Sequence, residues 1–131
     1  MKQLIATVLM MVCSLSWAKW ELISEDDEVS YYHNKSTMRK NGAIVRLWTI
    51  WEYSSVQTGD SGDIYKSAKE LRAFNCKLET SAVISVVHYE GSMGSGKTVW
   101  SVTLLEKEWA WVPIVPESIG EATWKIACGK K

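Results

Sequence analysis

The segment between residues 91 and 98 has the spacing of a phosphate-binding loop. Gly91 is followed, after four residues, by Gly96, Lys97 and Thr98. In such a loop the backbone N–H groups surround the phosphates and the lysine reaches the terminal one. The motif requires a strand before it and a helix after it, so that the phosphate lies at the helix N-terminus. The residues after Thr98 are instead rich in β-branched and aromatic types, which indicates a second strand. We therefore expect a β-hairpin that binds no ATP or GTP.

The glycines of this segment have a simpler role in a hairpin. We expect Gly91, Gly94 and Gly96 to supply the positive φ angles that a long turn requires. This interpretation assigns the three glycines to the shape of the turn rather than to a ligand.

The first residues have the features of a secretory signal peptide over residues 1–18. Lys2 provides the positive charge, an apolar run follows, and residues 16–18 (Ser-Trp-Ala) place small side chains at the −3 and −1 positions of a cleavage site. We therefore expect an exported protein, in the periplasm or on the outer-membrane surface, with a single mature domain over residues 19–131. Lipoprotein processing at Cys13 is the alternative, which is disfavoured because no small residue directly precedes Cys13.

Two cysteines, Cys76 and Cys128, remain after removal of the signal peptide. An even number of cysteines in an exported protein indicates a disulfide, and two cysteines allow only one intramolecular pairing. Closing a loop of this length stabilises a domain by about 4 kcal/mol in the chain-entropy model. The bridge would tie the C-terminal segment to the rest of the domain.

The remaining side chains show no pattern of a catalytic, metal or cofactor site. His33 and His88 are isolated, and no Cys or His pair has metal-ligand spacing. The chain contains no Gly-x-Ser-x-Gly nucleophile elbow. Because nothing in the sequence places a carboxylate beside either histidine, we expect both to be polar groups on the solvated face of a strand.

The balance of charge limits the kinds of partner. Fifteen acidic residues face fifteen basic ones, and loss of Lys2 with residues 1–18 leaves fourteen basic residues. Nucleic acids and anionic membrane surfaces attract proteins with a basic excess, so we expect neither as a partner. The acidic run at residues 25–28 is predicted to be a solvated loop, because it lacks the glycine and distal glutamate of a calcium loop.

Most of the mature chain has the period of two that is typical of strands. We expect strands at residues 20–23, 29–33, 43–53, 77–89 and 99–105. Residues 35–42 are predicted to form a turn region with one helical turn, and the polar residues 57–63 are the best candidate for a mobile insertion. Residues 109–116 contain two prolines, which excludes an ordinary central strand.

Residues 64–75 fit two different elements. Ile64, Ala68 and Leu71 have helical spacing, and good helix formers lie between them. A strand fits nearly as well, because Ala68, Phe74 and Cys76 have even spacing.

The C-terminal segment predicts a helix. Ser118 and Glu121 form a capping box, in which the serine accepts from the N3 amide and the glutamate reaches back to the cap amide. Gly129 marks the end of the helix. One face, formed by Ile119, Ala122 and Ile126, is predicted to lie on the sheet.

The order and spacing of these residues resemble one known family. The residues that match are Trp20, Tyr31, Tyr32, residues 36–39, 45–48, 65–71 and 74–76, Tyr89, residues 93–96, Trp109, Pro113, Pro116, Ser118 and Cys128. Over essentially the whole mature chain they are similar to the surface-adhesin protein E family of exported bacterial proteins. This chain has His33 at a position where the family often has Asp.

The resemblance implies an α+β fold, with an antiparallel sheet of about six strands and a C-terminal helix packed on one face. It also implies that the Cys76–Cys128 bridge tethers this helix, and it favours a strand for residues 65–75. The implied function is a non-enzymatic binding module that contacts extracellular-matrix or other proteins. The alternative is a structural or assembly accessory protein of the periplasm, whose partner is another envelope protein.

Both faces of the predicted strand at residues 43–53 carry large apolar groups, although a single helix covers only one face of a sheet. One face carries Val45, Leu47, Thr49, Trp51 and Tyr53, and the other Ile44, Arg46, Trp48, Ile50 and Glu52. Residues 109–116 or the N-terminal strand could cover the second face. Alternatively, the part of this face around Trp48, Ile50 and Trp100 contacts a second copy of the chain or a partner protein, because large exposed apolar patches mark interfaces.

Overall fold

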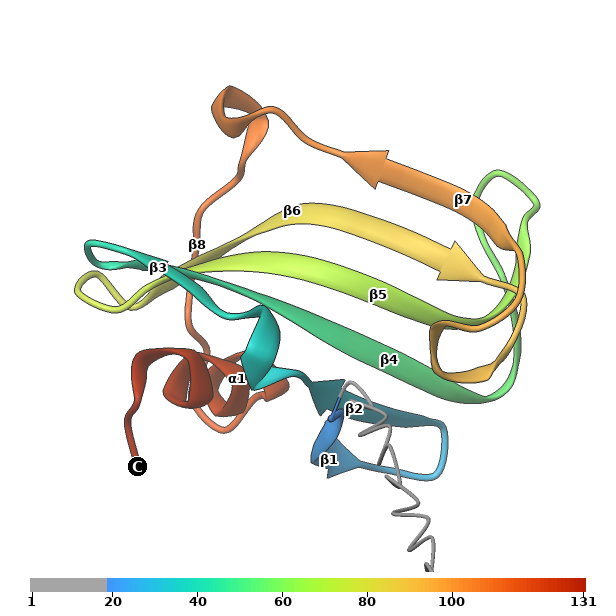
Figure 1. Ribbon diagram of the computed structural model, residues 1–131, viewed down its shortest axis with the longest axis horizontal. Helices are drawn as coiled ribbons and strands as arrows, with labels where there is room; N and C mark the ends of the chain where they lie inside the picture. The colour runs from blue at the N-terminus through green and yellow to red at the C-terminus, as the bar shows by residue number, and fades with distance from the viewer. Residues whose placement is uncertain (1–18) are drawn as a thin grey trace, which may run out of the picture.

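The computed structural model describes residues 19–131, which form one antiparallel sheet with a C-terminal α-helix (Figure 1). The sheet has eight strands in the order β1-β2-β4-β5-β6-β7, with β3 paired to β4 and β8 paired to β6. The elements are β1 (Glu21–Glu25), β2 (Val29–His33), a 3-10 turn (Lys35–Thr37), β3 (Arg39–Asn41), β4 (Ile44–Thr58), β5 (Ile64–Asn75), β6 (Thr80–Tyr89), β7 (Thr98–Thr103), β8 (Val112–Pro113) and α1 (Ile119–Cys128). The predicted fold class is therefore confirmed. The predicted signal peptide and Cys13 lie outside the described residues.

The ambiguous residues 64–75 form β5, a central strand of the sheet. β5 pairs with β4 on one side and β6 on the other. Ala68, Ala73 and Phe74 are buried there. Two ladders of backbone hydrogen bonds outweigh the preference of the helix formers in this segment, because intrinsic propensity is a weak prior against tertiary pairing.

The longest strand, β4, extends five residues beyond the predicted end at Tyr53, to Thr58. Its register with β5 shifts between Glu52 and Gln57. Lys66 fills the bulge, where its ammonium donates to the Glu52 carboxylate and to the Tyr53 carbonyl.

The polar loop between β4 and β5 is shorter than predicted. The amide of Gly59 donates to the Asp63 carbonyl at 2.8 Å, and the amide of Gly62 donates to the Gly59 carbonyl at 2.9 Å. The Asp63 carboxylate is also tied to His88 on β6. The segment predicted to be a mobile insertion is therefore a turn that is fastened to the sheet.

The ends of α1 follow the predicted capping signals. Ser118 accepts a hydrogen bond from the Glu121 amide at 3.1 Å, and Gly129 ends the helix in the left-handed conformation at φ 66°. One detail differs, because Glu121 Oε1 accepts from the amide of Glu117 at 3.4 Å rather than from that of Ser118.

The face that α1 turns to the sheet is not the predicted one. Thr123, Trp124 and Ala127 are its buried residues. The predicted stripe of Ile119, Ala122 and Ile126 is only half-buried. Trp124 decides the rotation of the helix, since its indole has the largest area to bury and its Nε1 donates to the Asn75 carbonyl at 3.1 Å.

The hydrophobic core lies between α1 and one end of the sheet, near β3 (Figure 1). Val45 and Leu47 on β4 and Phe74 on β5 pack there against Trp124 and Ala127 on the helix. The predicted disulfide is confirmed, because Cys76 and Cys128 are bonded with Cα atoms 5.5 Å apart. Both cysteines pack against the core, so the bridge and the apolar contacts hold the same end of the helix.

Candidate functional site

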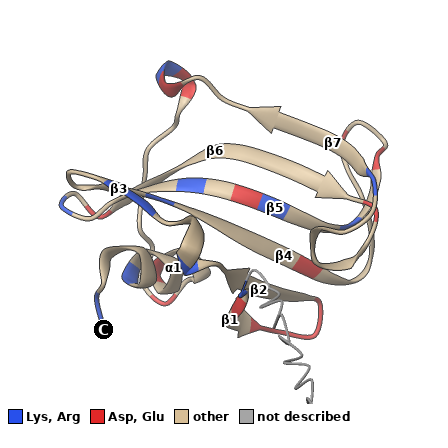
Figure 2. Cartoon of the chain, in the orientation of Figure 1, with Lys and Arg blue, Asp and Glu red and all other residues tan. Residues whose placement is uncertain are grey.

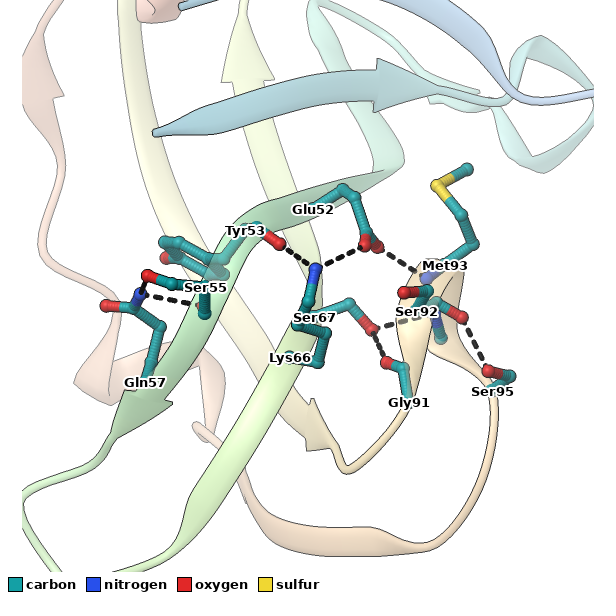
Figure 3. A network of polar contacts seen from close by, with 11 residues as sticks. Glu52, Tyr53, Ser55, Gln57, Lys66, Ser67, Gly91, Ser92, Met93 and Ser95 are labelled. Carbon is teal, nitrogen blue, oxygen red and sulfur yellow. Dashed lines mark hydrogen bonds and ion pairs between the residues drawn. The ribbon is translucent and has the colours of Figure 1, made fainter. Parts of the chain in front are cut away.

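The loop with phosphate-binding spacing connects β6 to β7 and lies against the sheet (Figure 3). Ser67 Oγ donates to the Gly91 carbonyl at 2.6 Å and accepts from the Gly94 amide at 2.9 Å. The Met93 amide donates to Glu52 Oε2 at 2.5 Å. The amides of Gly91 and Ser95 donate to carbonyls within the loop. The four loop amides at residues 91, 93, 94 and 95 therefore already donate within the chain. The predicted hairpin is confirmed, because β6 and β7 pair as antiparallel strands.

The glycines of this loop have two different roles. Gly94 and Gly96 have positive φ angles of 70° and 76°, as predicted, and Met93 joins them at 54°. Gly91 is extended at φ −99°, which any residue adopts, so the expectation of a positive angle there is wrong. A Cβ atom at Gly91 would approach the Ser95 backbone oxygen to 2.9 Å, so close approach is the reason for this glycine.

The face of the sheet opposite α1 is partly covered by distant segments of the chain. Ile50 on this face is 0% exposed, and Trp48 is half-buried. Lys69, paired with Ile50, places its ammonium 5.6 Å from the ring centre of Trp20 and 5.3 Å from that of Tyr89. The N-terminal segment therefore reaches this face, as the first of the two alternatives predicted. At the other end of this face, Trp109 lies over Arg46, and Trp111 lines the same hollow as these two residues.

The three residues predicted as a contact patch do not lie together. Strand register places Trp100 opposite His88, which pairs with Ala68. Ala68 in turn pairs with Trp51, whose side chain lies on the face that α1 covers. Trp100 is therefore on the opposite face from Trp48 and Ile50. In addition, Ile50 has no exposed surface for a partner to contact.

A row of aromatic rings crosses the helix-side face beyond the end of α1. Tyr53 meets Tyr65 edge-on at 5.7 Å, Tyr65 stacks on His88 at 3.7 Å, and His88 contacts Trp100 at 4.8 Å. All four side chains are half-buried. Sequence reasoning missed this row because its members come from four strands and meet only through their pairing.

His88 has a carboxylate beside it, contrary to the sequence expectation. Its Nδ1 lies 2.6 Å from Asp63 Oδ2, and Ser61 Oγ donates to the same carboxylate at 2.8 Å. The hydrogen bond from His88 holds the pKa of Asp63 below its ordinary value. Among residues 19–131 no serine, threonine or cysteine is hydrogen-bonded to His88, so this pair is not joined to a nucleophile.

His33 is not on a solvated face either. It is 3% exposed, and its Nδ1 is a buried ring nitrogen with no hydrogen-bond partner in the described chain. Its Nε2 lies 3.6 Å from Glu21 Oε2. Burial lowers the pKa of His33 and outweighs the opposing effect of the Glu21 charge.

A cavity of about 170 Å³ lies between the N-terminus of α1 and the sheet. Its charged lining consists of Arg72 and Glu70, which form an ion pair at 2.7 Å. Arg72 Nη1 also donates to Ser81 Oγ at 2.9 Å. The cavity is smaller than the ~300–1,000 Å³ typical of small-molecule sites, and its charges satisfy each other. Within residues 19–131 no three His, Cys, Asp or Glu side chains gather as metal ligands.

Together the fold and these surfaces define a class of protein, an antiparallel sheet with a disulfide-tethered helix and aromatic side chains on its surface. The family model of surface-adhesin protein E matches residues 20–129. The chain therefore belongs to the surface-adhesin protein E family, as the resemblance predicted.

Solved structures with the same fold come from Haemophilus influenzae. A crystal form of its protein E has 11% sequence identity and a TM-score of 0.59, covering 82% of this chain and 91% of that one. Protein E from a non-typeable strain has 13% identity and a TM-score of 0.57, covering 87% and 79%. No curated protein matches significantly by sequence. In the described part of the chain, α1 is too short to cross a membrane.

Proposed function

We propose that this chain is an exported, non-enzymatic binding module that contacts a protein of the extracellular matrix or of the cell envelope. Membership of the surface-adhesin protein E family supports a role at the cell surface. The absence of a nucleophile beside the Asp63–His88 pair in residues 19–131 supports binding rather than catalysis.

The outer edge of β7 is the observation that carries the proposal. β7 is the last strand of the sheet, and its sequence Thr-Val-Trp-Ser-Val-Thr contains no charge and no proline. The edge strands of monomers usually carry charged residues or proline, because an unpaired row of backbone N–H and C=O groups otherwise recruits other strands. A partner strand added here would also contact Trp100. Trp100 is the one residue of the predicted contact patch that lies on β7.

The direction of the backbone donors identifies the free edge. The Leu104 amide donates to the Ile84 carbonyl of β6 at 2.8 Å. Alternate amides of an antiparallel strand point in opposite directions, so those of Ser101 and Thr103 point away from β6. The side chains of both residues are exposed.

The test is a pair of lysine substitutions, Ser101→Lys and Thr103→Lys, that place charge on this edge. Because Thr103 Oγ1 also lies 3.0 Å from Oγ of the buried Ser85, Ser101→Lys alone is measured beside the pair. Cells that express the full chain are applied to surfaces coated with laminin, fibronectin or collagen, and adhesion is compared with that of the wild type. The matched control is Ser54→Lys with Ser55→Lys, two exposed residues in the β4 bulge.

We expect adhesion to fall at least about tenfold for the β7 variant and to remain for the control, as loss of an anchor contact predicts. Equal adhesion of both variants would refute the role of the β7 edge. Protease treatment of intact cells locates the chain, and protection from the protease together with no adhesion of the wild type would refute a surface adhesin.

A further inference from the structure

A second hollow lies on the face opposite α1, between the β3–β4 hairpin and the segment that leads to β8. Its volume is about 320 Å³, at the lower end of the ~300–1,000 Å³ range of small-ligand sites. Its lining includes Arg39, Asn41, Arg46, Glu106, Trp109 and Trp111, and Lys40 and Ile44 complete it. We call this hollow the arginine–tryptophan groove.

The two arginines are placed in a way that costs stability. Arg39 on β3 is the direct cross-strand partner of Arg46 on β4, and like charges in opposite positions repel. In the part of the chain that the structure describes, neither guanidinium forms an ion pair with a carboxylate. Unneutralised like charges at paired positions are a local conflict of the kind expected at functional sites.

The contacts of these arginines leave donors free for a ligand. Arg39 Nη1 donates to the carbonyls of Ser36 and Met38 at 3.0 and 2.9 Å. Within residues 19–131 the Arg46 side chain makes no hydrogen bond, and its Cζ lies 5.0 Å from the ring centre of Trp109. A guanidinium above an aromatic ring keeps its N–H edge available for a carboxylate or sulfate.

The uncharged and acidic residues of the lining indicate which kind of anionic ligand fits the groove. The rings of Trp109 and Trp111 lie 6.2 Å apart at 66°, and Trp111 is 40% exposed. Flat aromatic faces pack against the C–H faces of sugar rings. Glu106 and Asn41 offer acceptors for hydroxyl groups. The Glu106 carboxylate would repel the phosphates of a phosphopeptide or polyphosphate. It can accept hydrogen bonds from the hydroxyl groups of a saccharide that also carries carboxylates.

We propose that the arginine–tryptophan groove binds an acidic saccharide, with Arg39 and Arg46 on its carboxylate or sulfate and the tryptophans on its ring. The near-neutral charge of the whole chain does not oppose this, because the two arginines are concentrated at one end of the sheet. Figure 2 shows basic residues at β3, at that end.

The test uses trigalacturonic acid as the probe and its methyl ester as the uncharged form of the same trisaccharide. Protein is purified from the envelope of cells that express the full chain, and binding is measured by calorimetry and by shifts of the indole N–H signals. The variants are Arg46→Gln and Trp111→Ala, and Lys97→Gln in the β6–β7 loop is the control.

We expect the acid to bind, the ester to bind at least about tenfold more weakly, and added salt to weaken binding of the acid. Arg46→Gln is expected to weaken binding about tenfold while the melting temperature changes little, because the lost repulsion from Arg39 and the lost contact with Trp109 have opposite effects on stability. A purely structural role for Arg46 predicts a lower melting temperature. Lys97→Gln should bind as the wild type does.

Several results would overturn the proposal. These are no binding of the acid by the wild type, equal binding of acid and ester, or unchanged binding by Arg46→Gln. Hexaglutamate that competes as strongly as the trisaccharide would assign the groove to acidic peptides instead. Binding to phosphatidylglycerol vesicles without binding to the trisaccharide would assign it to a membrane surface. If Arg46→Gln does not fold, Trp111→Ala tests the groove instead, because this exposed residue lies outside the core. Unchanged binding of the acid by Trp111→Ala would then overturn the proposal.

Discussion

The two ends of the sheet are stabilised by different kinds of interaction. At the end near β3, α1 packs Trp124 on Leu47 and Phe74, and a disulfide joins the helix to the sheet. At the other end the β6–β7 loop is fastened by hydrogen bonds to Ser67 and Glu52 (Figure 3). Burial of apolar area contributes to the stability of the whole domain, whereas hydrogen bonds contribute a small net amount each and mainly order one loop. Changes at the helix end should therefore unfold the domain, and changes at the loop end should loosen it locally.

Replacing both cysteines is expected to have the largest effect. The double variant Cys76→Ala with Cys128→Ala should lose about 4 kcal/mol of unfolding free energy, because the bridge closes a long loop of 52 residues in the unfolded chain. Urea denaturation of oxidised protein measures it. The reduced wild type is the control and should resemble the variant. A loss below about 1 kcal/mol would show that packing alone holds the helix.

Removing an apolar side chain at the helix end should cost slightly less. Leu47→Ala is expected to lose roughly 3 kcal/mol, since Leu47 is 0% exposed and its removal leaves a cavity below α1. The matched control, Leu78→Ala, alters a leucine that is 67% exposed and should stay within about 0.5 kcal/mol of the wild type. Similar losses for the two variants in urea denaturation would contradict this description of the core.

At the loop end, Ser67→Ala should give a smaller and more local effect. Ser67 is 0% exposed, and its loss leaves the Gly94 amide and the Gly91 carbonyl without a partner, at a cost of about 2 kcal/mol. Hydrogen exchange should speed up at Gly94 and much less at Phe74. Equal acceleration at the two positions would show that the ends of the sheet are not independent.

His33 should make stability depend on pH near neutrality. Its folded pKa lies below the unfolded value of 6.5, so the unfolded chain binds more protons as the pH falls through 6.5. The unfolding free energy should therefore decrease from about pH 7 to pH 5. His33→Asn should remove this decrease. A slope that persists in His33→Asn would assign it to other groups.

Asp63 should act in a separate, more acidic range. Its folded pKa lies below 3.8, so its pairing stabilises the domain above that pH and is lost as the pH falls through the folded value. Melting temperatures of the wild type and Asp63→Asn should converge below about pH 4. Curves that remain parallel throughout would contradict the effect of the His88 hydrogen bond.

The smallest effect on stability and binding is expected from Lys97, the lysine of the segment with phosphate-binding spacing. Lys97→Ala should change neither stability nor nucleotide binding, because Lys97 is exposed and four amides of the loop already donate within the chain. Calorimetric titration of the wild type with Mg-ATP should show no heat of binding. Heat that disappears in Lys97→Ala would refute the hairpin interpretation of function.

The amino-acid sequence by itself determined the features that depend on neighbouring residues. The alternation after Thr98 distinguished a hairpin from a nucleotide loop, and Ser118 and Gly129 marked the limits of α1. The pairing of Cys76 with Cys128 followed because no other mature cysteine competes. The strand and cap signals depend only on local geometry, and the disulfide has only one possible pairing.

Tertiary structure alone decided the features that depend on strand register. Helical and extended patterns were nearly equal in residues 64–75, and pairing with β4 and β6 made the strand. Register likewise placed Trp100 opposite the face of Trp48 and brought Asp63 to His88. A shift of one residue in register would move Trp48, His88 or Trp100 to the other face of the sheet. Such positions are set by contacts between distant segments, which the local pattern of residues does not encode.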